Sequence, residues 1–128
     1  MNEQTKEYNA LVHCSLPVLK EGFESLLESL SAKINVSYQD LSINLMCKVS
    51  PELDAIILLE DEADADFGLC HKVKMFSYNT PVLLIMPEAP AAYIEYLKSM
   101  SGVSILISPF TVQEFCNAME YTFQLNKE

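Results

Sequence analysis

The sequence lacks arginine and tryptophan altogether and has only three glycines among its 128 residues. Its eight basic residues are all lysines and face 18 acidic residues, so the formal net charge is −10. Duplex DNA is bound by clustered cations that displace counterions from its phosphates, and anionic membrane surfaces attract the same kind of cluster. Direct binding of nucleic acid or of a membrane by this chain is therefore disfavoured.

Long apolar runs are missing as well. The longest, at residues 55–59 and 82–86, have five residues each, whereas a transmembrane helix needs about 20. Residues 1–8 carry charged side chains where a secretory signal would have an apolar segment. We therefore expect a cytoplasmic protein.

The common signatures of cofactors and catalytic sites are also absent from the sequence. Its four cysteines form no CxxC pair, and its glycines form neither GxGxxG nor a P-loop. His13 adjoins Cys14, but neighbouring residues of a strand point to opposite faces, so a catalytic dyad is disfavoured. We predict no cofactor, no bound metal and no enzymatic activity.

Short apolar segments alternate with amphipathic ones along the whole chain. The predicted strands are 8–14, 34–38, 55–59, 82–86 and 103–107. The predicted helices are 17–30, 41–49, 66–78, 91–100 and a last one that carries Val112, Phe115, Met119 and Phe123. Strict alternation predicts a single α/β domain over residues 1–128, with a doubly wound, five-stranded parallel sheet between two layers of helices, as in flavodoxin-like folds.

Sites in such a sheet lie beyond the carboxyl ends of the strands. That rule selects a small group of candidates: Cys14, Ser15, Leu59, Glu60, Met86, Ser108 and Pro109. The third strand is also followed by five carboxylates within seven residues, at Glu60, Asp61, Glu62, Asp64 and Asp66. This run lacks the glycine and the terminal glutamate of a calcium loop, so we expect a solvated negative surface that favours a basic partner.

The first predicted helix resembles that of receiver domains in the NarL/LuxR subgroup of bacterial response regulators, where P-L-V-R-E-G-L followed by L-L is typical. The matching residues are 17–23 (PVLKEGF) and the pair Leu26-Leu27. Residues 53–58 (LDAIIL), 81–85 (PVLLI) and 102–110 resemble the third, fourth and fifth strands of that family. The resemblance covers residues 8–125 and implies the CheY-like (βα)5 receiver fold.

Receiver chemistry requires an acidic pair for Mg²⁺, an aspartate as phosphoryl acceptor, a serine or threonine, and a lysine. The resemblance places Cys14 and Ser15, Leu59, Met86 and Ser108 at these positions in turn. None of them can do the corresponding chemistry, so phosphotransfer is not expected. We interpret the chain as a degenerate receiver domain, or pseudo-receiver, whose vacated pocket is filled by apolar side chains.

Two details of this alignment bear on regulation. A shift of one residue would place Glu60 at the acceptor position, where its permanent charge could mimic a phosphorylated aspartate. The switch aromatic of the fifth strand corresponds to Ile105, so the usual coupling between pocket and surface is not expected.

The resemblance implies a non-enzymatic regulatory domain that binds a protein partner or forms a homodimer independently of phosphorylation. A helix-turn-helix domain follows the receiver domain in this subgroup, so we expect contact with DNA only through a C-terminal domain beyond residue 128. Tyr93, Tyr96 and Met100 form a stripe at helical spacing and, with Ile105, are candidates for the interface or for the edge of the core. The alternative is a ligand- or redox-sensing domain that uses the vacated pocket or Cys14.

Overall fold

The computed structural model describes residues 7–14, 17–39, 53–59, 80–87 and 91–124. The predicted helices at 41–49 and 66–78 lie outside the described residues, as do Ser15 and the acidic run that begins at Glu60.

Five strands form one parallel sheet. They are β1 (Glu7–Cys14), β2 (Lys33–Tyr38), β3 (Ala55–Leu59), β4 (Val82–Met86) and β5 (Val103–Ile107). Their order is β2-β1-β3-β4-β5, and every neighbouring pair is parallel. The predicted doubly wound sheet is confirmed, and its strand order reverses at β1 and β3, next to which such folds place their sites.

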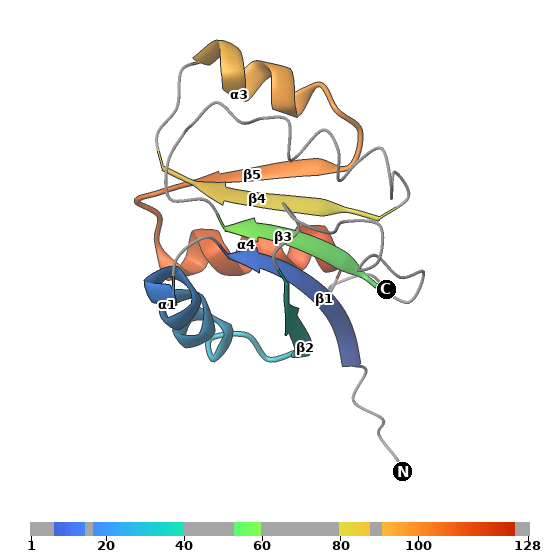
Figure 1. Cartoon of the computed structure of the whole chain (residues 1–128), viewed down its shortest axis with the longest axis vertical. Helices are drawn as coiled ribbons and strands as arrows, with labels where there is room; N and C mark the ends of the chain where they lie inside the picture. The colour runs from blue at the N-terminus through green and yellow to red at the C-terminus, as the bar shows by residue number, and fades with distance from the viewer. Residues whose placement is uncertain (1–6, 15–16, 40–52, 60–79, 88–90, 125–128) are drawn as a thin grey trace.

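Helices cover both faces of the sheet. Helices α1 (Pro17–Leu27) and α4 (Val112–Phe123) lie on one face, and α3 (Ala91–Lys98) lies on the other (Figure 1). Phe23 of α1 and Phe115 of α4 pack in one buried cluster with Ile57, whereas Leu97 of α3 packs in a second cluster with Ile56. The two clusters on opposite faces confirm the predicted three layers.

The two central strands explain this arrangement. Every residue of β3 (AIILL) and of β4 (VLLIM) is buried. Successive side chains of a strand point to opposite faces, so a continuous apolar run must be covered from both sides. Strand β2 has one neighbour, and there exposed residues alternate with half-buried ones, as expected at an edge.

Helix α4 has a complete capping box at its start. The Glu114 N–H donates to Thr111 Oγ1 at 3.0 Å, and the Thr111 N–H donates to Glu114 Oε1 at 2.9 Å. The helix ends at Gln124, whose backbone is left-handed at φ 57° and whose N–H bonds the carbonyls of Glu120 and Tyr121. These two ends fix the length of α4, and Phe115 anchors it between the rings of Phe23 and Phe110 at centroid distances of 6.0 and 6.4 Å.

Two predicted helices end earlier than their apolar patterns indicate. Helix α1 ends at Leu27, where the predicted helix extended to residue 30, and α3 ends at Lys98, before the predicted end at residue 100. In both, the next backbone N–H groups bond carbonyls three residues back, as in Leu30 to Leu27 and Met100 to Leu97. Such bonds tighten the last turn and end the regular helix.

Candidate functional site at the carboxyl ends of the strands

The carboxyl ends of four strands meet at one edge of the sheet. Cys14 is paired in register with Leu59, and Leu59 in turn with Ile85. Met86 lies opposite Ile107, and the Ser108 N–H donates to the Met86 carbonyl at 2.9 Å. The structure thus brings the predicted positions at the ends of β1, β3, β4 and β5 to a common edge.

Apolar side chains occupy this edge at two of the predicted positions. Leu59 is 4 % exposed and Met86 is 2 % exposed. Leu59 packs in the cluster beneath α1 and α4, and Met86 packs in the cluster beneath α3. Neither side chain has a nucleophile or an oxygen atom for a hard cation, so neither can take part in phosphoryl transfer.

A cavity of about 230 Å³ opens between α1 and the strand ends. It is lined by Val18, Leu19, Gly22, Phe23, Leu26, Leu59, Ile85, Met86, Ser108 and Phe110. Ser108 is the only one of these residues with a polar side chain, and none carries a charge. Such a lining suits a small apolar group and disfavours a phosphoryl group, whose charge needs cations or strong donors.

Five of the lining residues belong to α1 and were not among the predicted site residues. The strand-end rule selects only residues at the ends of strands, because these carry the sites of doubly wound folds. The signal was present in the apolar stripe formed by Leu19, Phe23 and Leu26. Phe23 is buried in the core, and the same stripe also borders the cavity.

The last two residues of β1 are His13 and Cys14. Cys14 is half-buried against the cluster beneath α1 and α4, while His13 is buried and paired in register with Leu58.

Tyr38 is the last residue of β2. Its hydroxyl donates to Glu24 Oε2 at 2.9 Å, and Lys20 Nζ lies 4.5 Å from the centre of its ring. Burial above all raises the pKa of Tyr38, and the hydrogen bond and charge of Glu24 raise it further. The phenol therefore remains a hydrogen-bond donor that ties β2 to α1.

The predicted interface residues have different surroundings. Tyr96 is 43 % exposed on α3, whereas Met100 and Ile105 are partly buried against the cluster beneath that helix. The side chain of Tyr93 lies outside the described part of the structure. Pro109 is exposed and follows a cis peptide bond. Of the four candidates, Tyr96 is the one for which the structure describes a broadly exposed side chain.

Two further observations concern the described residues as a set. Within the ranges that the structure covers, no three His, Cys, Asp or Glu side chains are grouped so that they could hold a metal ion. No helix in those same ranges is both long enough and apolar enough to cross a membrane.

No family model and no curated protein matches this sequence. Solved structures do match its fold. A CheY-like response regulator from Mesorhizobium loti is 16% identical, with a TM-score of 0.68 over 91% of this chain and 99% of that one. The signal receiver domain of an HD domain-containing protein from Pseudomonas fluorescens Pf-5 is 18% identical, with a TM-score of 0.70 over 94% and 97% of the two chains.

A third match is a putative pilus assembly-related protein from Burkholderia pseudomallei, 15% identical, with a TM-score of 0.73 over 91% of this chain and 90% of that one. These similarities establish the CheY-like receiver fold that the sequence predicted. At such low identity they concern the fold alone.

Replacing Leu59 tests whether the site is apolar. Leu59→Asp is expected to lower the free energy of unfolding by about 3 kcal/mol or more, because it puts a carboxylate into a buried site with no lysine among the described lining residues. Leu59→Met keeps the volume and apolar character and should cost less than about 1.5 kcal/mol. Urea unfolding measures both variants, and equal losses would contradict an apolar site.

Proposed function

We propose that the chain is a non-enzymatic regulatory domain with a receiver fold, which binds a protein partner or a second copy of itself without phosphorylation. The observation that carries this proposal is the cavity at the carboxyl ends of the strands. Leu59, Met86 and Ser108 line it at the positions that the receiver resemblance assigns to the acceptor, the hydroxyl and the lysine.

Phosphoryl transfer would need three things at this site: a nucleophile, oxygen ligands for Mg²⁺, and a cation to balance the charge of the phosphoryl group. Leu59 supplies no nucleophile, Met86 no hydroxyl, and Ser108 no positive charge. Apart from Ser108, the described lining residues are apolar, so they would not compensate a dianion for its lost hydration. These properties support a domain that does not respond to phosphorylation.

A single packed conformation also fits this function. Ile105 is partly buried in the same cluster as Leu84 and Met86. It has no ring that could swing between a buried and an exposed position, and close-packed interiors do not deform continuously. We infer that the domain presents one constant surface to its partner.

The wider context that we propose is a bacterial transcription regulator of the NarL/LuxR type. The support for it is the resemblance of residues 17–23 and of the Leu26-Leu27 pair to that subgroup. In such a regulator a separate C-terminal domain would contact DNA, because this chain has no arginine and a net charge of −10.

Incubation with Mg²⁺ and a small phosphodonor tests the central part of the proposal. The intact mass is expected to stay unchanged, because no acceptor carboxylate lies at the end of β3 in the aligned position. A standard receiver domain treated in parallel serves as the positive control. An adduct of about 80 Da on this chain would contradict the proposal.

We propose Tyr96 as part of the surface that binds the partner or the second copy. Its ring is 43 % exposed on α3, and its backbone carbonyl accepts from the Ser99 hydroxyl at 2.6 Å near the end of that helix. An aromatic side chain on an ordered helix offers a large contact area at small entropic cost. Met100 and Ile105 would support this surface from the core side.

Tyr96→Glu is expected to convert a dimer into a monomer in light scattering, with little change in melting temperature, because the side chain is not part of the core. Tyr121→Glu makes the same change at an exposed position of α4 and should leave the mass unchanged. A mass unaffected by Tyr96→Glu would identify Tyr96 as an edge of the core and contradict its role in the interface.

A second candidate function is binding of a small apolar ligand, and the cavity of about 230 Å³ is the observation that favours it. Its volume accommodates a group of a few carbon atoms beside the Ser108 hydroxyl. The redox version of this alternative has less support, since Cys14 is half-buried against the core.

Toluene is a suitable probe of the cavity. If the cavity is a ligand site, toluene should raise the melting temperature in proportion to the logarithm of its concentration. Gly22→Leu should abolish the rise, because Gly22 lines the cavity and a Cβ atom there would meet nothing within 4 Å, so the larger side chain has room to fill the space. A melting temperature that does not respond to toluene would contradict this second candidate function.

A further inference from the structure

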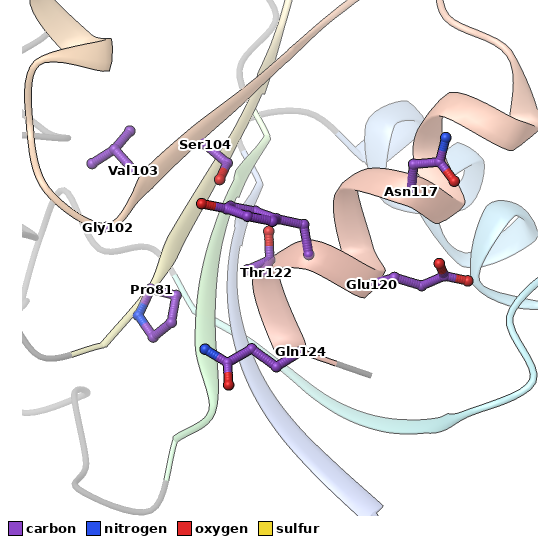
Figure 2. Close-up of a pocket in the computed structure, with 9 residues that line it drawn as sticks. Pro81, Gly102, Val103, Ser104, Asn117, Glu120, Thr122 and Gln124 are labelled. Atoms are coloured by element: carbon purple, nitrogen blue, oxygen red, sulfur yellow. The ribbon is translucent and has the colours of Figure 1, made fainter. Parts of the chain in front are cut away.

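A second concave site lies at the amino ends of the strands, away from the cavity at their carboxyl ends. It is a groove of about 670 Å³ between the starts of β4 and β5 and the last turns of α4 (Figure 2). The lining residues are Pro81, Gly102, Val103, Ser104, Asn117, Glu120, Tyr121, Thr122 and Gln124. Unlike the cavity at the carboxyl ends, this groove is rich in side-chain oxygen atoms, and none of its described lining residues is a lysine.

Thr122 is the unusual residue of the groove. It is 3 % exposed, and its buried Oγ1 has no hydrogen-bond partner in the described structure. Figure 2 shows Thr122 on the side of α4 that faces β5 and Ser104. A buried hydroxyl without a partner costs free energy, and a ligand that bonds it recovers that cost.

The electrostatics of the groove favour a cation. The carboxyl end of α4 lies there, and the partial negative charge of a helix end attracts positive groups. The last turn of α4 has no basic residue, and Glu120 adds a carboxylate to the lining. An anion would be repelled by the same groups, so negatively charged ligands are disfavoured.

The remaining side chains suit a planar cation in particular. Tyr121 is 77 % exposed and provides an aromatic surface, on which guanidinium groups stack. Ser104, Asn117 and Gln124 add oxygen acceptors, of which Asn117 Oδ1 already accepts from Gln113 Nε2 at 2.9 Å. A guanidinium has five donors in one plane, so it can bond several of these oxygens at once.

We propose that this groove binds the guanidinium group of an arginine in a basic, extended segment of a protein partner. The 128 residues of this chain contain no arginine, so neither they nor the same residues of a second copy can supply the group. The groove adjoins the start of β5, which is the last strand in the sheet order and has β4 as its one neighbour. An extended segment can add to such an edge, which favours a peptide over a free small molecule.

This inference rests on the proposed function only in taking the partner to be a protein. The groove and the apolar cavity lie at opposite ends of the strands, so the two ideas fail separately. Loss of the groove's binding would leave the phosphodonor result untouched, and a phosphoryl adduct would leave the groove untouched.

The test uses a blocked peptide with a central arginine between valine and threonine residues, followed by amide chemical shifts of the protein. Saturable shifts at Ser104 and Thr122 are expected. The same peptide with citrulline, which has the shape of arginine without its charge, should bind about tenfold more weakly. Equal binding of the two peptides would overturn the proposal, and so would free methylguanidinium binding as tightly as the arginine peptide.

Variants of the protein separate a specific site from general attraction to an acidic surface. Thr122→Val keeps the side-chain shape and should weaken binding about fivefold without lowering the melting temperature, whereas Thr122→Ser should bind as the natural protein does. Glu120→Gln should weaken binding about threefold, whereas Glu28→Gln, with the same change in net charge in the turn after α1, should have no effect. Unchanged binding by Thr122→Val, or equal effects of the two glutamine variants, would overturn the assignment.

Discussion

The burial of β3 and β4 on both faces is the constraint on which the rest of the molecule depends. All five residues of β3 and all five of β4 are apolar and buried, so helices must cover the sheet from both sides. Phe115 of α4 and Leu97 of α3 meet this requirement from opposite faces. The doubly wound strand order follows, because parallel neighbours need crossover connections that carry such helices.

The same constraint shapes the two ends of the sheet differently. At the carboxyl ends the apolar runs continue to Leu59 and Met86, so apolar side chains line the cavity where this fold usually carries its chemistry. At the opposite ends the strands meet the last turns of α4, which bring Glu120 and Thr122 beside Ser104. Among the described residues, polar side chains therefore gather at the amino ends of β4 and β5, whereas the cavity at the carboxyl ends is lined by apolar residues and Ser108.

Much of the fold could be predicted from local sequence pattern. All five strands were located to within about a residue or two, because uninterrupted apolar runs such as 55–59 and 82–86 leave little choice of register. Helix ends were less predictable, since the bonds from Leu30 to Leu27 and from Met100 to Leu97 depend on how the chain turns towards the next strand. At the site, the strand-end rule selected Leu59 and Met86 but not the lining residues that α1 contributes. The groove at Thr122 could not be predicted from the sequence, because residues from different elements come together only in the folded structure. Residues 104 and 122 are distant in sequence, and no pattern reveals that a threonine hydroxyl will be buried without a partner.

The central claim is that the carboxyl ends of the strands form a packed site without receiver chemistry. Amide chemical shifts recorded with Mg²⁺ and beryllofluoride, a mimic of the phosphoryl group, test this most directly. We expect the resonances of Leu59, Met86 and Ile105 to stay where they are in the free protein. Saturable shifts at these three residues would show that the site binds a phosphoryl group and changes conformation, which would contradict the account.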